Sequence, residues 1–491
     1  MNLSYLDIGI VVVYILLVFF LGSIVKKYIT GISDYLVAGR SMGFNLGLIS
    51  LMCTEIGMIT YIYYAELGYK AGFASLMAAF PPVIAYLFLG KTGFIITPLL
   101  NMKIMTIPEF FSKRFSKGVR FYVGILMAVG GILNFGVFPG VEAKFINIIT
   151  GISEHYLLLT MVIMLTIVLI YTLVGGMVSV IVTNYIQYAL LSFGMIFITI
   201  YGVIKIDWTV ITNQVVTNMG EKGINSFFPD GDFGINFLIW QTLMWISILV
   251  GWQAISMRLF SSKDSKTGEK IYRWSGLMFL ARAILPIFWG IMAYAYFQSI
   301  GMEVEPLDAL PKLLVAILPS GILGLIFAGL LAASMSTYAS YLLSWSSVVS
   351  QDIIGSIIKF FTKKEISSKK QLLISRITIA AVMIFIIWWS LFHEMEGYLY
   401  FYLNMTAMLF IPGTLATVML GIYWKKARVA GAYLSFTLSV LPPIFYLIFT
   451  KELESYASLL GWGGFALAFI GMFLGSWIHN LINSNPEGEA A

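Results

Sequence analysis

The residues Ala333-Ser334-Met335-Ser336-Thr337 lie inside the apolar run from about Leu313 to Val349. Ala333, Ser336 and Thr337 stand at positions i, i+3 and i+4, so they share one face if this run is helical. That face carries two hydroxyl oxygens and, where a neighbouring helix lets it tilt, a backbone carbonyl. Oxygen ligands of this kind suit hard cations without any formal charge at the site. The alternative interpretation is close helix packing, for which small residues at this spacing are common in membranes.

The composition places this face in a membrane. Of the 491 residues, 59% are hydrophobic and 11% are charged, and the mean hydropathy is +0.90. No soluble domain hides that much apolar surface, so we expect an all-α polytopic membrane protein in contact with the lipid bilayer. The single cysteine, Cys53, excludes a disulfide framework and a cysteine-based metal cluster.

Thirteen apolar runs have about the length that crosses a bilayer. They are 5–25, 43–66, 72–98, 119–149, 155–174, 177–203, 234–256, 274–298, 310–349, 372–392, 397–422, 429–449 and 458–480. The first run is not expected to be a signal peptide, because no lysine or arginine lies between Met1 and Asp7.

Basic residues alternate between successive connections. The connections after runs one, three, seven, nine and eleven hold 22 of the 30 lysines and arginines, so the net charge of +6 marks topology and not a nucleic-acid partner. By the positive-inside rule the N-terminus lies outside and the C-terminus in the cytoplasm, which requires an odd number of crossings. We therefore expect a multi-pass protein of the plasma membrane.

No connection is long enough for a separate domain. The longest, about 206–234, is acidic, and residues 481–491 form a short polar tail. We expect one transporter domain over residues 1–491, with no signalling or enzymatic appendage and no obligatory protein partner. The sequence shows no nucleophile–base or metal constellation of an enzyme.

Four ionisable residues lie at the predicted depth of the bilayer, where charges are costly and mostly functional. They are Glu55, Glu142, Lys144 and Arg282. The alternative is that they form charge pairs that hold helices together. Glu55 is the stronger functional candidate, because Gly57 permits a backbone break beside it, and unwound backbone in a membrane lines a cavity or is buried in protein.

A second candidate break follows Trp245, at Val250-Gly251-Trp252-Gln253, five runs after the first. Two broken helices related in this way are typical of transporters built from an inverted repeat, which bind their substrates near the midplane. The spacing of glycine and polar residues carries this expectation, since no clear internal sequence similarity is visible.

Five stretches together resemble the sodium/solute symporter family. In order along the chain they are Asp34–Ser41 (DYLVAGRS), Thr106–Phe115 (TIPEFFSKRF), Tyr171–Gly176 (YTLVGG), Ala332–Thr337 running on to Ser350–Ile353, and Gly421–Ala427 (GIYWKKA) with Gly431–Ala432. The nearest branch is expected to be the sodium/proline symporters, because Glu55 stands where that branch has an aspartate.

The resemblance implies a five-plus-five inverted repeat, with residues 43–203 as the first repeat and 234–422 as the second. One additional helix, 5–25, precedes the repeats, and two additional helices within 429–480 follow them. The resemblance also implies sodium-coupled import of a small organic solute, an amino acid, carboxylate or sugar, by alternating access.

The sodium site that the resemblance implies combines the first break with the face described at the outset. Its ligands are the backbone carbonyls of Cys53 and Ile56, the carbonyl of Ala333 and the hydroxyls of Ser336 and Thr337. Sodium is expected as a transported ion and not as a resident cofactor.

The candidates for substrate binding surround the two breaks. They are Thr54, Glu55, Gly57, Glu142, Trp245, Leu249, Gln253 and Arg282. Trp245 stands where the proline branch has a substrate-stacking tryptophan, but Leu249 replaces a tyrosine of that branch, and Trp252-Gln253 replaces a glutamine–proline pair. Proline itself is therefore not the expected substrate.

One sodium ion per transport cycle is expected. Members of the family with a second site use an aspartate that is Asn184 here, and two hydroxyls whose positions are Ala339 and Ser340 here. A site without formal charge offsets the dehydration of a cation poorly. Two alternatives stay open, namely proton-coupled uptake by the same fold and a transporter-derived solute sensor. A channel is disfavoured, because no continuous polar stripe follows the apolar runs.

Overall fold

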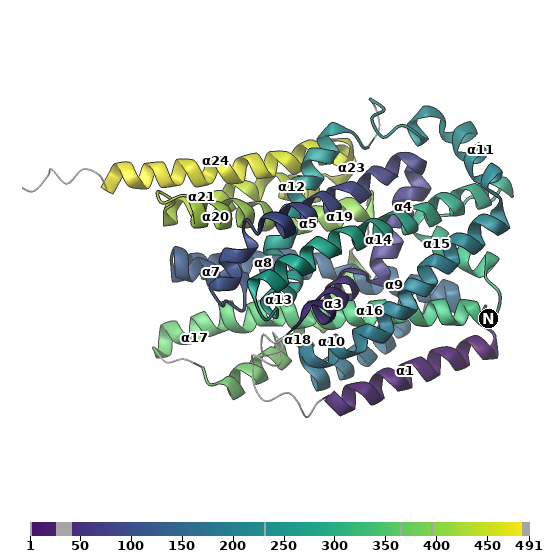
Figure 1. Ribbon diagram of the computed structural model, residues 1–491, viewed down its shortest axis with the longest axis horizontal. Coiled ribbons are helices and arrows are strands. Elements are labelled where there is room, and N and C mark those ends of the chain that lie inside the picture. Colours follow the sequence, from purple (N-terminus) through teal and green to yellow (C-terminus); the bar gives the residue numbers. More distant parts are fainter. Residues whose placement is uncertain (1, 26–41, 230–231, 364–365, 394–395, 484–491) are drawn as a thin grey trace, which may run out of the picture.

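The stretch Ala333–Thr337 lies in α16 (Ile322–Ser347), which runs through the middle of the helix bundle (Figure 1). Almost every α16 side chain from Leu323 to Ser347 is buried. The helix continues through a π-helical segment, η6 (Val348–Ile354), into α17 (Gly355–Thr362). The structure is a computed structural model that describes residues 2–25, 42–229, 232–363, 366–393 and 396–483. The motif Asp34–Ser41 lies outside these residues.

The described chain is helical, with one isolated β-bridge between Met42 and Ser262. The elements before the acidic loop are α1 (Tyr5–Val25), α3 (Phe44–Glu55), α4 (Met58–Ala71), η3 (Gly72–Ala79), α5 (Phe80–Thr92), α6 (Ile96–Asn101), α7 (Ile107–Arg114), α8 (Lys117–Gly136), α9 (Phe138–Thr150), η4 (Glu154–Tyr156) and α10 (Leu157–Ile206). The loop itself holds α11 (Trp208–Met219) and η5 (Gly220–Gly223).

Fewer elements lie between the acidic loop and the C-terminus. They are α12 (Ile235–Gly251), α13 (Gln253–Phe260), α14 (Ser265–Ser299), α15 (Pro306–Ile317), the α16–η6–α17 segment, α18 (Ser368–Phe392), α19 (Leu399–Ala407), α20 (Ile411–Tyr423), α21 (Val429–Ser439), α22 (Leu441–Ile448), α23 (Thr450–Leu453), η7 (Glu454–Tyr456) and α24 (Ala457–Asn483).

Membrane-length helices are fewer than the thirteen predicted crossings. Among the described residues eight helices are long and apolar enough to cross a membrane, or up to ten if each of two bent pairs is one span. Every predicted run falls on helix, but the structure divides the runs differently. The 3₁₀ turns of η3 carry α4 into α5 without a polar connection, so residues 58–92 form one continuous stretch. Similarly, α10 covers the predicted runs 155–174 and 177–203 except for residues 155–156, which lie in η4, and most of its side chains across Tyr171–Gly176 are not described.

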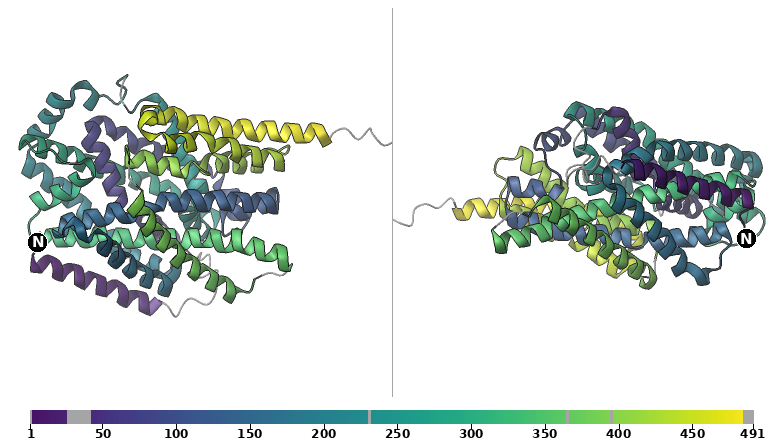
Figure 2. Two further views of the ribbon diagram at one scale, coloured as in Figure 1. Left: turned by 180° about the vertical axis from the view of Figure 1, so that it is seen from behind. Right: turned by 90° about the horizontal axis from the view of Figure 1, so that it is seen from below.

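The first and last helices lie at opposite edges of the bundle. In Figure 1, α1 runs along the lower edge and α24 along the upper edge, and the view from behind in Figure 2 shows the same arrangement. α1 contacts α10 and α16, whereas α24 packs on α20, α21 and α12. The helices predicted as additions to the repeats, at 5–25 and 429–480, are therefore peripheral.

Helix ends follow local sequence signals. The Ser116 hydroxyl accepts the Val119 N–H at the start of α8, and the Asp264 carboxylate accepts the Thr267 N–H at the start of α14. Pro108 occupies the first turn of α7, where its missing N–H would have no helical partner. These caps fix the connections in which the basic residues gather.

Two glycines bring α4 against α14. A Cβ atom on Gly68 would lie 1.9 Å from the backbone oxygen of Ile287, and one on Gly290 would lie 1.9 Å from that of Ala65. Only glycine permits this backbone contact, as is typical of small residues between membrane helices. The contact holds α14, which carries Arg282, next to the helix that follows the first break.

Candidate functional site

The predicted break in the first half lies at Ile56 and Gly57, between the end of α3 and the start of α4. The Gly57 N–H donates to Thr60 Oγ1 at 3.2 Å, and the Thr60 N–H donates to the Gly57 carbonyl at 3.0 Å. In an unbroken helix these two N–H groups would donate to the carbonyls of Cys53 and Ile56. The break therefore releases the two carbonyls that were predicted to bind sodium.

The hydroxyl of Thr337 lies directly against this break. A Cβ atom on Gly57 would be only 2.7 Å from Thr337 Oγ1, and this oxygen donates to the carbonyl of Thr54 at 3.4 Å. Ala333 stands one helical turn before Thr337 and is fully buried. The structure thus brings the face of α16 and the unwound residues of the first break into contact.

The other predicted hydroxyl, that of Ser336, has a defined orientation. Its Oγ donates to Asn184 Oδ1 at 2.9 Å, and Asn184 Nδ2 donates to Ser50 Oγ at 3.3 Å. A serine that donates its hydrogen to a neighbour keeps its oxygen lone pairs available for a cation. Asn184 is therefore suited to orient Ser336 as a metal ligand.

A cavity of about 90 Å³ adjoins the first break. It is lined by Thr54, Glu55, Ile59, Thr60, Tyr63, Asn134, Phe138, Met244, Trp245, Ile248, Trp252, Arg282, Thr337, Tyr341, Tyr400, Leu403, Asn404 and Ala407. Four of the predicted substrate-binding residues are among them, namely Thr54, Glu55, Trp245 and Arg282. Thr337 also lines the cavity, so the candidate ion and substrate sites adjoin.

The cavity contains one pair of opposite charges. Arg282 Nη1 lies 3.7 Å from Glu55 Oε2, and both side chains are buried. The Arg282 guanidinium also lies 3.9 Å from the ring centre of Phe279. Within the described residues neither Glu55 Oε1 nor Arg282 Nε has a hydrogen-bond partner. One hydrogen-bond acceptor, Glu55 Oε1, and one donor, Arg282 Nε, therefore have no partner at the cavity. The charges of Glu55 and Arg282 cancel, so the lining residues carry no net charge.

Glu142 is not among the cavity-lining residues and contacts backbone instead. From α9 its Oε1 accepts the Ile59 N–H in the first turn of α4 at 3.0 Å, and its Oε2 accepts the Ser334 hydroxyl of α16. Both carboxylate oxygens therefore contact the junction between the broken helix and α16, and direct contact of Glu142 with a substrate stays a prediction. Lys144, two residues on, pairs with Asp308 at 2.8 Å.

Three further predicted residues are also absent from the cavity lining. Gly57 packs against Thr337, and Leu249 is buried, with its carbonyl accepting the Tyr272 hydroxyl at 2.7 Å. Gln253 follows the bend of 52° between α12 and α13 and is not among the residues that line the cavity. The side-chain amide of Gln253 accepts the Ile107 N–H at 3.1 Å.

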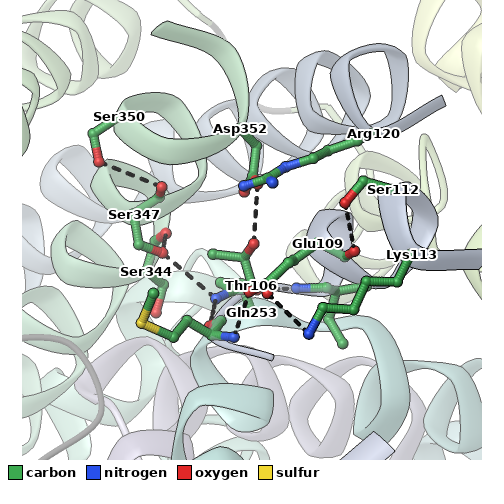
Figure 3. A network of polar contacts seen from close by, with 12 residues as sticks. Thr106, Glu109, Ser112, Lys113, Arg120, Gln253, Ser344, Ser347, Ser350 and Asp352 are labelled. Carbon is green, nitrogen blue, oxygen red and sulfur yellow. Dashed lines mark hydrogen bonds and ion pairs between the residues drawn. The ribbon is translucent and has the colours of Figure 1, made fainter. Parts of the chain in front are cut away.

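Gln253 belongs to an inner network of polar contacts, which also includes Thr106, Arg120, Ser347 and Asp352 (Figure 3). Thr106 Oγ1 donates to Asp352 Oδ1 at 3.0 Å, and Arg120 Nη2 lies 2.6 Å from the same oxygen. The network joins the connection before α7, the start of α8, α13 and η6. It lies at the end of the bundle where the basic connections gather.

Several cavity residues were not predicted. Asn134 and Asn404 are amides inside apolar runs, so their polarity was a signal in the sequence. Tyr63, Tyr400 and Trp252 gave no such signal, because aromatic residues in a membrane helix are equally typical of a packed core.

The amino-acid sequence of the chain is similar to those of a known protein family. The model of a family described as "Sodium:solute symporter family" matches residues 35–438. Sodium/glucose cotransporter 4 of Danio rerio is 25% identical over 475 residues, which are 88% of this chain and 70% of that protein. The sodium/myo-inositol cotransporter of Mus musculus is 25% identical over 477 residues, 87% of this chain and 64% of that protein. The chain thus spans about two thirds of the length of these relatives.

Two solved structures share the fold. A Na+-coupled sialic acid symporter in a substrate-bound outward-open state gives a TM-score of 0.80 at 18% identity, over 97% of this chain and 98% of that one. Mhp1, a nucleobase-cation-symport-1 family transporter in a closed conformation, gives 0.56 at 15% identity, over 92% and 96%. Three of the matching relatives are named for glucose, myo-inositol and mannose, which corrects the expected proximity to the sodium/proline branch.

Proposed function

Because the chain belongs to the sodium:solute symporter family, we propose that it imports a small neutral polyhydroxylated solute together with sodium by alternating access. The family consists of multi-pass membrane transporters, so the chain is not an enzyme. The substrate, the ligands, the stoichiometry and the topology are parts of the proposal.

The observation that carries the substrate class is the pair Glu55–Arg282. At 3.7 Å the two charges compensate each other, so the cavity favours a solute without net charge. The unsatisfied Glu55 Oε1 accepts a hydrogen bond and the unsatisfied Arg282 Nε donates one. Two neighbouring hydroxyls of a polyol satisfy both atoms at once, and the ring of Trp245 offers an apolar face to the solute. The sugar and inositol names of the relatives favour the same class.

A neutral amino acid is the second candidate, because the same pair is complementary to a zwitterion. Its ammonium group would face Glu55 and its carboxylate would face Arg282. Such a substrate would separate the two protein charges, whereas a polyol leaves them paired. We therefore place polyols first.

For sodium we propose the site at the first break. Its ligands are the carbonyls of Cys53, Ile56 and Ala333 and the hydroxyls of Ser336 and Thr337. Support comes from the redirected N–H groups at the break and from the contact of Thr337 with Gly57. We propose one sodium ion per cycle, because Asn184 supplies no formal charge beside this site.

The membrane arrangement is part of the same proposal. Residues 43–203 and 234–422 form the two inverted repeats, with 5–25 before them and 429–480 after them. The basic connections place the N-terminus outside and the tail 481–491 in the cytoplasm of a cell whose plasma membrane holds the protein. Thirteen crossings result under two conditions. First, α3 and α4 together form one broken span, and α5 forms a separate one. Second, α10 contains two spans.

Uptake into proteoliposomes tests this function. Labelled glucose, mannose, myo-inositol and a neutral amino acid are offered with an inward sodium gradient, with a proton gradient alone and with neither. We expect a polyol to accumulate only with sodium. Accumulation driven by protons alone would establish the alternative coupling, and accumulation of the amino acid alone would establish the second substrate class.

A further inference from the structure

A buried polar cluster begins at the proposed sodium ligand Ser336 and extends one helical turn beyond it, to Ser340. Its members are Ser50, Cys53 and Thr54 of α3, Asn184 of α10, Ser336 and Ser340 of α16, and Arg258 of α13, and each is at most 1% exposed. Hydroxyl and amide oxygens gathered from three helices are the ligand type of a hard-cation site. The cluster thus has the composition of a second cation site next to the first.

Ser340 lies at the centre of this cluster and is engaged on several sides. Its Oγ donates to the carbonyl of Ser336 at 2.7 Å and lies 3.5 Å from Thr54 Oγ1. The guanidinium of Arg258 donates from Nη2 to the same Oγ at 2.5 Å. The hydroxyl that a second cation would use therefore already accepts a hydrogen bond from a cationic group.

Asn184 closes the other end of the cluster. Its Oδ1 accepts the Ser336 hydroxyl at 2.9 Å, and its backbone carbonyl accepts the Cys53 thiol at 3.2 Å. An asparagine adds no formal charge, whereas arginine stays protonated in proteins. The cluster of seven side chains consequently carries one positive charge, and a positive charge at short range in a medium of low dielectric constant repels a further cation.

We propose that Arg258 is a built-in cation that occupies the polar cluster through Ser340 and so excludes a second sodium ion. The proposal rests on the sodium coupling proposed above. It explains the binding of a single sodium ion by Arg258 of α13, and not by Asn184 alone. The guanidinium enters from the helix that follows the second break, so the two halves of the molecule meet at this point. Arg258 is a specificity-determining residue for the number of ions.

Exchanging the formal charges of the cluster tests the proposal. Asn184→Asp adds a carboxylate that Arg258 neutralises, so the Hill coefficient of sodium activation should stay near 1. Asn184→Asp combined with Arg258→Met leaves the carboxylate without its internal cation, and the coefficient should then approach 2. In parallel, the charge moved per neutral substrate should rise from about one to about two. Arg258→Lys in the Asn184→Asp background restores an internal cation and should return both values to one.

The outcomes separate this proposal from the proposed function. A coefficient near 2 in Asn184→Asp alone would overturn the proposal, because a sodium ion would then bind despite Arg258. A folded double variant that still moves one charge per substrate would overturn it equally. If the double variant does not fold, the Asn184→Asp result decides by itself. A wild-type uptake rate that does not depend on sodium would instead overturn the proposed function.

Discussion

The two helix breaks are built alike but have different surroundings. In each, a hydroxyl just beyond the break donates to a carbonyl before it: Thr60 Oγ1 to Glu55 O at 3.1 Å, and Ser256 Oγ to Val250 O at 3.0 Å. The first break lies beside α16 and the pair Glu55–Arg282. The second presents Trp252, whose ring stacks on Phe410 with centroids 5.7 Å apart.

This difference indicates that the two helix breaks serve different functions. The first break exposes carbonyls and a carboxylate, which suit a cation and a polar solute. The second break is apolar towards the cavity, and its next residue, Gln253, accepts the Ile107 N–H of the inner network. Unwound backbone at membrane depth lines a cavity or is buried in protein, and at the first break the freed carbonyls lie beside a hydroxyl group that suits a cation.

The largest effect is expected at the charged side of this comparison. Glu55→Gln leaves the buried Arg282 without its counter-charge, and loss of one partner of a buried pair costs roughly 3–5 kcal/mol. We expect sodium-driven uptake to fall by at least about a hundredfold, measured in proteoliposomes with equal amounts of inserted protein.

A double variant separates folding from transport at this pair. Glu55→Gln with Arg282→Met removes both charges, so it should insert and survive detergent extraction as the wild type does, yet stay inactive. Recovery of uptake in this double variant would mean that the pair only holds helices together.

Adding one methyl group to each break compares them directly. In Gly57→Ala the new Cβ lies 2.7 Å from Thr337 Oγ1 and displaces a proposed sodium ligand. In Gly251→Ala it lies 2.7 Å from the Thr414 methyl carbon, whose hydroxyl bonds within its own helix to Phe410 O at 2.8 Å. The sodium concentration for half-maximal uptake should rise about tenfold, or about 1.4 kcal/mol, in the first variant only. An equal rise in both would abolish the distinction between the breaks.

A smaller effect on transport is expected from a substitution at Gln253, where the second break meets the inner network. Gln253→Leu keeps the side-chain volume but removes a partner from the buried N–H of Ile107 and from the Met105 carbonyl, at a cost of about 1–3 kcal/mol. We expect the inner end to open more often, so that a cysteine introduced at Ser347 reacts several-fold faster with a reagent applied from the cytoplasmic side. Unchanged labelling would show that Gln253 does not hold this end closed.

The sequence predicted the helical class and the first break, because apolar runs of bilayer length and a glycine beside a buried acid are local signals. Charge pairing among the ionisable residues at bilayer depth was one of two open interpretations, and the structure pairs Glu55 with Arg282. The sequence did not predict that Gln253 contacts the Ile107 N–H and the Met105 carbonyl, since residues about 150 positions apart come together only in the folded chain. The contact of Glu142 with the Ile59 N–H likewise depends on how α9 crosses α4, and tertiary geometry of this kind has no signature in a single sequence.

We propose above that sodium binds where the first break meets α16. Ser336→Ala and Thr337→Ala each remove one oxygen from a proposed set of five, and Thr417→Ala is the control, because its hydroxyl bonds back to Gly413 O within α20 at 2.6 Å. The most direct measurement is the sodium dependence of initial uptake in all three variants. We expect half-maximal activation to require about tenfold more sodium in the first two variants, or about 1.4 kcal/mol, and an unchanged concentration in the control. Wild-type sodium dependence in both Ser336→Ala and Thr337→Ala would contradict this proposal.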